Sequence, residues 1–343
     1  MRQHGDDRMH AEDALPKIAR ALWTVGIDEV AIREEALPAP SNDEVLVQTL
    51  FSAISGGTES LVLAGKIPTS EYGRMRAPRQ AGDFPFPVKY GYAAVGLVVD
   101  GPAEWIGRRV FALHPHQDRF VVRVAALTPV PEGIPAQRAV LMANLETALN
   151  AVWESGVGPG DRVAIIGTGV VGSLIAAIVS RMPAIDLTLI DIDPAKAARA
   201  ELFRSRFRRI SDVIDIAYDF DCIFHTSGDG AGLSAALDLA AFEAKIIEVS
   251  WYGANEVTLP LGQAFHSRRL QIIASQVGHV PPDRRARFDF ARRMSVVSRL
   301  LDDIRLDTLI GEAIFLDEAP RRFADVMARR NGSAPIIRYT TRD

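Results

Sequence analysis

The chain has 343 residues, of which 48% are hydrophobic and 24% are charged, and its formal net charge is −4. That length is enough for two domains of ordinary size, each with its own core. No basic excess points to nucleic acid as a partner. Gly, Ser or Arg interrupt the longest apolar segments, so we expect a globular protein without a membrane span.

The N-terminal residues 1–18 are polar and mixed in charge. They lack the apolar stretch of a signal peptide, so we expect a mobile tail and a cytoplasmic location. The single cysteine, Cys222, lies in an apolar strand pattern, where we expect a small buried core residue. One cysteine allows neither a disulfide within the chain nor a cysteine-rich zinc site.

Residues 19–146 contain short apolar runs of period two, such as 44–49 and 119–124, divided by Gly and Pro. This alternation predicts an antiparallel, β-rich unit. Residues 147–280 change to alternating strands and helices, the pattern that a parallel, doubly wound sheet needs. The predicted strands are 162–167, 187–191, 221–226, 245–249 and 270–275, with a helix around 232–239.

Residues 281–343 are expected to return to the first unit. Asp283, which follows two prolines, is the predicted N-cap of one long helix that runs towards Leu301. The segment 334–340 is typical of a last strand. We interpret the basic residues of the predicted helix as a solvated face: Arg284, Arg285, Arg287, Arg292 and Arg293.

A glycine pattern follows the first strand of the second unit: Gly167, Gly169 and Gly172. Gly167 lets the chain turn, Gly169 lets main-chain N–H groups approach a pyrophosphate, and Gly172 lets the next helix pack close to the strand. Val170 and Val171 complete this turn. With a strand before it and a helix after it, the pattern predicts a dinucleotide-binding site.

The next strand ends on Asp191, about 20 residues after the glycines, where a carboxylate can accept hydrogen bonds from a ribose 2′-hydroxyl. Ile192 follows at the same edge. The carboxylate would repel the extra phosphate of NADP, and Lys196 and Arg199 are expected one or two helical turns further on. We therefore predict NAD as the cofactor and disfavour NADP. Asp193 is interpreted as an N-cap rather than a ligand.

Three segments resemble the medium-chain dehydrogenase/reductase superfamily, which includes the zinc-type alcohol dehydrogenases: residues 107–110, 157–163 and 191–194. The resemblance implies an α/β fold with a GroES-like, β-rich catalytic domain over 19–146. It also implies a Rossmann doubly wound parallel sheet over 147–280 and a C-terminal return over 281–343. The active site would lie between the domains, and analogy favours a homodimer.

The positions of the superfamily's catalytic zinc differ in this chain. Many members hold the metal through a Cys, a His-Glu pair and a further Cys or Glu. The corresponding segments here are 55–59, 91–96 and 141–144, which carry no such ligand set. The lobe with four structural-zinc cysteines is missing. Because zinc needs three or four N, S or O donors, we expect no zinc.

Residues 54–59 and 91–96 are similar to the corresponding segments of bacteriochlorophyllide-type hydroxyethyl dehydrogenases. This resemblance implies oxidation of a secondary alcohol, or the reverse, and leaves the substrate open. Without zinc, a side chain must take or give the alcohol proton. Tyr92 replaces a zinc ligand, so its hydroxyl is the first candidate; the alternative is an aromatic ring packed beneath the cleft. Lys89 is a candidate for lowering the pKa of Tyr92, although a solvated lysine is the simpler interpretation.

Further catalytic candidates lie on the facing segment and on a polar loop. Thr58 is a candidate for orienting the substrate or a proton relay, Ser55 is a further catalytic candidate, and Glu59 is expected to make a structural hydrogen bond or ion pair. His114 and His116 are backup acid–base groups, because imidazole titrates near neutrality. A new metal site on these histidines and Glu59 is disfavoured, since such histidines are usually solvated or hydrogen-bonded.

The resemblance implies further cofactor contacts. Thr147 matches a threonine that packs against the nicotinamide. Residues that follow the later strands lie where Rossmann ligands bind, although each could equally be loop filler: Thr226, Ser227, Gly228, Ser250, Trp251 and Gln276.

The leading hypothesis is a zinc-independent, NAD-dependent oxidoreductase that interconverts a small-molecule secondary alcohol and a ketone. A second is NADPH-dependent reduction of an activated C=C bond, as in zinc-free quinone or enoyl reductases, and Asp191 argues against it. A third is a dinucleotide-binding sensor without catalysis. The groups that face nicotinamide C4 distinguish these hypotheses, because only apolar groups there would favour the sensor.

Overall fold

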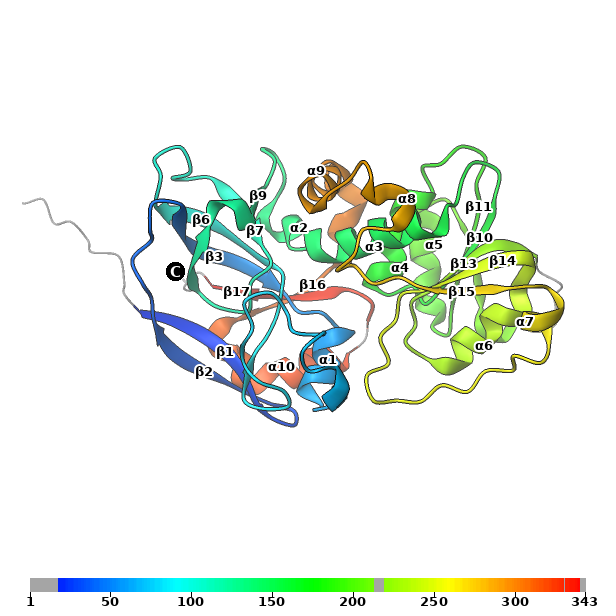
Figure 1. Cartoon of the computed structure of the whole chain (residues 1–343), viewed down its shortest axis with the longest axis horizontal. Coiled ribbons are helices and arrows are strands. Elements are labelled where there is room, and N and C mark those ends of the chain that lie inside the picture. The colour runs from blue at the N-terminus through cyan, green and yellow to red at the C-terminus, as the bar shows by residue number, and fades with distance from the viewer. Residues whose placement is uncertain (1–17, 213–218, 330, 340–343) are drawn as a thin grey trace, which may run out of the picture.

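Three β-sheets and the helices around them form two units that lie side by side along the longest axis of the molecule (Figure 1). The structure is a computed structural model that describes residues 18–212, 219–329 and 331–339. Residues 1–17 of the predicted tail lie outside the described residues. Within the described ranges, no helix is long and apolar enough to cross a membrane.

The first unit is β-rich, as the period-two runs predicted. Its four-stranded sheet has the order β2-β1-β5-β4, with bounds Glu29–Ala36, Ile18–Gly26, Val88–Lys89 and Ala81–Gly82. Its seven-stranded sheet has the order β16-β17-β3-β6-β7-β9, with β8 beside β3. These strands span Ile310–Phe315, Ala334–Arg338, Glu44–Ala53, Ala94–Asp100, Arg109–Ala112, Leu127–Pro129 and Arg119–Arg123. Only β16 and β17 pair in parallel among these named strand pairs.

The second unit contains a parallel sheet in the order β12-β11-β10-β13-β14-β15. Its strands span Arg206–Arg209, Asp186–Asp191, Arg162–Ile166, Phe220–His225, Ala240–Glu248 and Gln271–Ala274. All five predicted strands are confirmed, and the sheet has the Rossmann strand order, in which ligands bind at the carboxyl ends beside the first strand. Strand β12 was not predicted, because three of its four residues are arginines and give no apolar run.

Helices pack on both faces of the parallel sheet. Val163 and Ile165 of β10 pack with α3 and α4. Ala164 and Ile166 pack with α6 on the opposite face, so β10 is buried on both sides and its run is apolar. These and other α-helices span Thr58–Leu63 (α1), Ala136–Ala139 (α2), Met142–Ser155 (α3), Val170–Val179 (α4), Ala197–Leu202 (α5), Gly230–Leu239 (α6), Ala264–Ser267 (α7) and Ala319–Ala328 (α10).

One apolar core continues from the first unit into the second through α3. It contains Val95 of β6, Leu145 of α3 and Ile165 of β10. The predicted burial of Cys222 on β13 is confirmed. The two units therefore share packing along α3, which lies between them (Figure 1).

The C-terminal segment differs from the prediction of a single helix. Instead of one helix capped by Asp283, two form: α8 (Pro282–Arg285) and α9 (Phe290–Leu300). The side chain of Asp289 accepts a hydrogen bond from the main-chain N–H of Arg292, and this cap starts a new helix. The predicted return strand is confirmed as β17, which pairs antiparallel with β3.

The basic residues of α9 do not all form a solvated face. Arg293 is only 1% exposed. It donates to Glu146 at 2.7 Å, to Oδ1 of Asn150 at 2.6 Å and to the carbonyl oxygen of Val277 at 2.7 Å. The solvated-face interpretation is therefore wrong for this arginine, because α9 packs against α3 and turns it inward.

Candidate active site

The glycine turn has the geometry that its sequence predicted. Gly167, directly after β10, has a φ of +94°, and a Cβ there would lie 2.6 Å from the main-chain nitrogen of Ser227. A Cβ on Gly172 would lie 2.1 Å from the carbonyl oxygen of Gly167, so only glycine lets α4 pack this close. Gly169, the N-cap of α4, faces open space. The turn is tightly packed behind and open in front, where the N-terminus of α4 can meet an anion.

Asp191 ends β11 beside this turn. Its Oδ2 accepts hydrogen bonds from the main-chain N–H and the hydroxyl of Thr168, both at 2.7 Å. Its Oδ1 accepts a hydrogen bond from the N–H of Asp193 at 3.0 Å. Asp193 also caps the next turn by accepting from the N–H of Ala195, so the predicted N-cap is confirmed. These donors hold the Asp191 carboxylate at the carboxyl edge of the sheet.

Arg199 lies closer to this acid than its helix position suggested. Its Nη1 donates to the carbonyl oxygen of Thr168 at 3.0 Å and to Oγ of Ser173 at 2.8 Å. Lys196 is buried and its ammonium donates to the carbonyl oxygen of Asn331. Arg199 and Lys196 therefore both lie near the glycine turn and Asp191. Each already donates hydrogen bonds to oxygen atoms of the protein.

Most of the other predicted cofactor residues lie at the carboxyl ends of the parallel strands. Thr147 is the exception, because it lies on α3, where its hydroxyl donates to the carbonyl oxygen of Ala143. Their places are after β13 for Thr226, Ser227 and Gly228, after β14 for Ser250 and Trp251, after β15 for Gln276, after β11 for Ile192, and at the start of α4 for Val170 and Val171.

A buried polar cluster behind Ser227 was missed in the sequence analysis. His225 is fully buried, with Nε2 2.7 Å from Oγ of Ser227 and Nδ1 2.7 Å from Oε2 of Glu248. Tyr252 donates to the same carboxylate at 3.0 Å. With Glu248 as a carboxylate and His225 as a neutral imidazole, Nδ1 carries the proton and the hydroxyl of Ser227 donates to Nε2. Ser227, which is exposed, then presents oxygen lone pairs at the carboxyl edge of the sheet.

The residues present fit a dinucleotide better than they fit a metal. The open face at Gly169 and the anchored carboxylate of Asp191 suit a pyrophosphate and a ribose. In the part of the chain that the structure describes, no three His, Cys, Asp or Glu side chains gather as a metal-ligand group. Ser55 and Tyr92 offer hydroxyl groups, which are not the usual zinc ligands.

Tyr92 and the segment that carries Ser55 and Thr58 come together in the first unit. The ring of Tyr92 packs edge-on to Tyr90, with centroids 6.2 Å apart. Burial raises the pKa of Tyr92 to about 12, the charge of Glu59 adds to the rise, and hydrogen bonding to Ser55 and Thr58 opposes it. The phenol therefore keeps its proton at neutral pH and acts as a hydrogen-bond donor rather than a base.

A loop of the second unit meets the first unit at this place. Trp251 packs against the same apolar cluster as Tyr92. The N–H of Ala254 donates to the carbonyl oxygen of Lys66 at 3.0 Å. Gly253 has a φ of +61°, and a Cβ there would lie 2.6 Å from that oxygen. The segment after β14 thus brings the predicted cofactor edge next to Tyr92.

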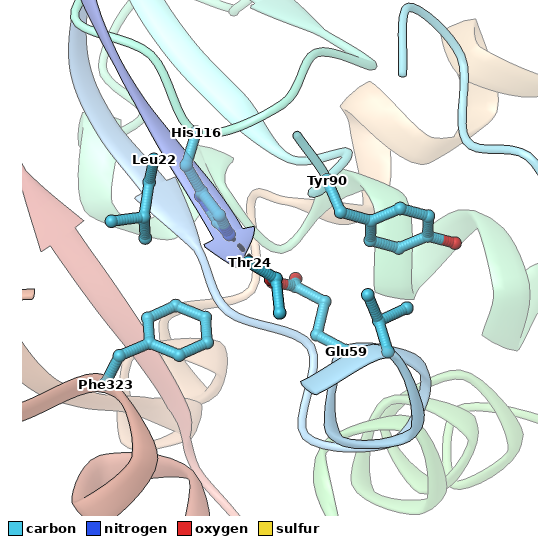
Figure 2. A pocket seen from close by; sticks show the side chains of 7 residues that line it. Leu22, Thr24, Glu59, Tyr90, His116 and Phe323 are labelled. Carbon is cyan, nitrogen blue, oxygen red and sulfur yellow. Dashed lines mark hydrogen bonds and ion pairs between the residues drawn. The ribbon is translucent and has the colours of Figure 1, made fainter. Parts of the chain in front are cut away.

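Glu59 is 4% exposed and points at His116, and both line a small cavity together with Thr24 and Tyr90 (Figure 2). Its Oε1 accepts from the N–H of Ser55 at 2.8 Å, and its Oε2 lies 2.8 Å from Nε2 of His116. The cavity has a volume of about 10 Å³, which is room for about one water molecule. The structural hydrogen bond or ion pair predicted for Glu59 is present.

His116 continues these contacts inward. Its Nδ1 lies 2.7 Å from Oγ of Ser52, which in turn lies 2.8 Å from the hydroxyl of Tyr339. Ser52 and Tyr339 were missed in the sequence analysis, because 287 positions separate them along the chain. No local spacing signals such a contact.

Two expectations about neighbouring side chains are wrong. His114 stacks on Phe120 with ring centroids 3.9 Å apart, and burial lowers its pKa to about 3, so it does not titrate near neutrality. Lys89 is buried rather than solvated. Its ammonium pairs with Glu35 at 2.5 Å, so Lys89 is not free to act on Tyr92.

Comparison with known proteins finds similar sequences and similar folds. No protein-family model matches the chain. D-xylulose reductase A of Aspergillus niger is 24% identical over 243 residues, which cover 64% of this chain and 64% of that protein's length. The structure of 2R,3R-butanediol dehydrogenase of Bacillus subtilis matches with a TM-score of 0.73 at 16% identity, covering 94% of this chain and 100% of that chain. L-idonate 5-dehydrogenase of Escherichia coli matches with a TM-score of 0.76 at 14% identity, covering 94% and 98%.

The chain has the fold of these dehydrogenases. Its first unit is the GroES-like domain and its second is the Rossmann domain, so the predicted α/β fold class is confirmed. In this fold, Tyr92 lies in the GroES-like domain and the glycine turn in the Rossmann domain. The loop of Trp251 joins the two at the candidate site.

Proposed function

We propose that this chain is a zinc-independent oxidoreductase that interconverts a small-molecule secondary alcohol and a ketone, with NAD as the cofactor. The similar proteins named above are dehydrogenases and a reductase, which supports this reaction class. One observation carries the proposal. Tyr92, whose hydroxyl lies near Ser55 and Thr58, packs on the same apolar cluster as Trp251 in the loop of the Rossmann domain.

The mechanism follows from these side chains. The bound cofactor supplies or accepts the hydride. In the direction of reduction, the Tyr92 phenol donates its proton to the carbonyl oxygen of the substrate, and Ser55 and Thr58 orient the phenol. A general acid of this kind contributes on the order of 10²–10⁴-fold to the rate. Trp251 and the apolar cluster beneath Tyr92 help to exclude water.

The preference for NAD rests on Asp191 and its neighbours. Three hydrogen bonds keep its carboxylate where a ribose 2′-hydroxyl would donate to it. A 2′-phosphate there would meet that negative charge. Arg199, the cation best placed to offset the repulsion, already donates to Thr168 and Ser173.

Zinc independence rests on the donor set. Glu59 is the carboxylate whose charge acts on Tyr92, and its two oxygens already bond the N–H of Ser55 and the imidazole of His116. Ser55 and Tyr92 offer only hydroxyl oxygens, which bind zinc poorly beside thiolate and imidazole. Purified protein should therefore contain far less than one zinc per chain by elemental analysis, and a stoichiometric, chelator-sensitive zinc would contradict the proposal.

The first experiment is a fluorescence titration of the purified protein with NADH and NADPH in parallel. We expect micromolar NADH binding and weaker NADPH binding, followed by turnover of a secondary alcohol with NAD. Tighter NADPH binding would favour reduction of an activated C=C bond. Binding without turnover of any alcohol or ketone would favour the sensor.

Replacement of Tyr92 tests the proton donor. Tyr92→Phe keeps the ring and its packing and removes only the hydroxyl. We expect kcat to fall by about 10²-fold or more, as for loss of a general acid, while NADH affinity stays unchanged. Tyr72→Phe, a partly buried ring in the same apolar cluster, is the matched control. Wild-type turnover by Tyr92→Phe would remove Tyr92 from the mechanism.

A further inference from the structure

Four side chains from distant parts of the chain form one hydrogen-bonded line. It runs from Glu59 on α1 through His116, in the loop before β8, to Ser52 on β3 and Tyr339 just after β17. The three steps measure 2.8, 2.7 and 2.8 Å. Glu59, His116 and Ser52 are buried, whereas Tyr339 is partly exposed. The line thus joins the segment beside Tyr92 to a partly exposed tyrosine just after β17.

The hydrogen bonds give this line a direction. With Glu59 as a carboxylate and His116 as a neutral imidazole, Nε2 of His116 donates to Glu59 and Nδ1 carries no proton. Nδ1 therefore accepts from the hydroxyl of Ser52, and the oxygen of Ser52 accepts from the hydroxyl of Tyr339. Every donor in the line points towards Glu59. A proton can consequently move from Tyr339 to Glu59 by small shifts within existing hydrogen bonds.

The line lies against the backbone that carries Tyr92. Gly91 has a φ of +110°, and a Cβ there would lie 2.9 Å from Nε2 and Cδ2 of His116. The imidazole therefore occupies the space beside the residue that precedes Tyr92. Ser55 lies near both groups, since its N–H donates to Glu59 at 2.8 Å and its side chain is close enough to lower the pKa of Tyr92.

The other charged groups around the line already have partners. Lys89 pairs with Glu35 at 2.5 Å. Asp118 accepts from the main-chain N–H of Arg20 at 2.8 Å. His114 bonds the carbonyl oxygen of Pro115 and stacks away from the line on Phe120. Glu59 is therefore the group at which a proton can be stored next to Tyr92.

We propose that Tyr339, Ser52 and His116 form a proton relay that neutralises Glu59 while Tyr92 is ionised. This role rests on the proposed function, in which Tyr92 gives its proton to the product oxygen. As the Tyr92 O–H bond breaks, the Nε2–H proton of His116 moves to Glu59, Ser52 protonates Nδ1, Tyr339 protonates Ser52, and water protonates Tyr339.

The relay is reversible, and its protons balance. When the product leaves, water returns a proton to the Tyr92 phenolate, the line shifts back, and Tyr339 releases one proton to solvent. The two negative charges of Tyr92 and Glu59 are thus never present together, which lowers the cost of ionising the phenol. His116, Ser52 and Tyr339 act through Glu59 and are positioning residues.

The tautomer of His116 tests the direction of the line without cofactor or substrate. ¹⁵N NMR of histidine-labelled protein, with His116→Gln to assign the signal, should show a neutral ring protonated at Nε2. Ser52→Ala should shift the Nδ1 resonance, because its donor is lost. A ring protonated at Nδ1, or an imidazolium at neutral pH, would overturn the relay.

His116→Gln separates a relay from a merely structural contact. Glutamine can still donate a hydrogen bond to Glu59, but it cannot pass a proton. We expect kcat for reduction to fall at least tenfold with an altered solvent deuterium isotope effect, while NADH affinity and the unfolding midpoint stay unchanged. Tyr339→Phe should act in the same direction, with Tyr72→Phe as the control.

Each contrary outcome is distinguishable from failure of the proposed function. Wild-type kcat and isotope effect in His116→Gln would overturn the relay while leaving the oxidoreductase intact. A kcat that falls together with the unfolding midpoint would assign a structural role and overturn the relay. If the unmodified protein turned over no alcohol or ketone, the proposed function itself would fail and the relay with it.

Discussion

The Asp191 carboxylate is held by Thr168 and Asp193 at the edge where a ribose would bind. In Asp191→Ser, the acceptor for the 2′-hydroxyl and the charge opposing a phosphate are both lost. We expect NADH to bind about tenfold more weakly, about 1.4 kcal/mol, and the gap to NADPH to narrow. Parallel titrations with both cofactors measure this. Asp193→Ser is the control, and an unchanged preference in Asp191→Ser would refute the ribose contact.

His114 should contribute to the acid sensitivity of the fold. Burial lowers its pKa to about 3, whereas an exposed histidine titrates near pH 6.5. Between these values the unfolded chain binds a proton that the folded chain does not. The stability is therefore complete above about pH 6.5 and falls by about 1.4 kcal/mol for each pH unit below it.

His114→Asn keeps a side-chain N–H near the carbonyl oxygen of Pro115 and removes the titrating group. We expect the slope of unfolding free energy against pH, between pH 6 and pH 4, to fall by the amount that one proton contributes, about 1.4 kcal/mol per pH unit. Urea unfolding at three pH values in this interval measures the slope. A slope equal to that of the unmodified protein would contradict the buried, neutral state of His114.

At the scale of elements, α9 is attached to α3 by a buried ion pair. Burial raises the pKa of Glu146, and Arg293 opposes the rise. Arg293→Met leaves that carboxylate without its partner, which should cost on the order of 3–5 kcal/mol in unfolding free energy. Adding Glu146→Gln should recover part of the loss. Arg292→Met, on the exposed side of the same helix, is the control and should change stability by about 0.5 kcal/mol or less.

Elements were predictable where the cause is local. β10 is buried on both faces, so its residues form a continuous apolar run that predicts a strand. Gly167 and Gly172 are required by close main-chain contacts within one strand–turn–helix. β12 was not predictable from hydrophobicity, because edge strand Arg206–Arg209 is largely exposed. The division between α8 and α9 depends on the cap at Asp289, which periodicity does not reveal.

At the scale of the whole molecule, the two domains meet where the Trp251 loop touches the segment after α1. Gly253→Ala would place a Cβ 2.6 Å from the carbonyl oxygen of Lys66, at a φ of +61°. We expect the loop to shift, with a fall in kcat of about tenfold and little change in the unfolding midpoint. Steady-state kinetics and thermal unfolding test this. Gly262→Ala, in open space, is the control; equal kinetics in both variants would show that the contact does not shape the site.

The candidate site was only partly predictable, because its parts differ in sequence separation. The glycine turn and Asp191 lie within one short segment, and their spacing is informative. The line from Glu59 to Tyr339 joins four separate segments, so no spacing indicates it. Burial changed the interpretation of Lys89 and His114, since tertiary packing decides which polar side chains lose contact with water.

The position of β17 has a consequence for how the protein is made. This strand lies between β16 and β3, and only its arrival completes the seven-stranded sheet. The strands of the Rossmann domain, by contrast, are contiguous and leave the ribosome earlier. During synthesis the Rossmann domain can therefore fold while Phe51–Ala53 of β3 still lack their pairing with β17. An unpaired strand end is the kind of surface that recruits chaperones or pairs with another chain. The GroES-like domain closes last, although its first strands are made first.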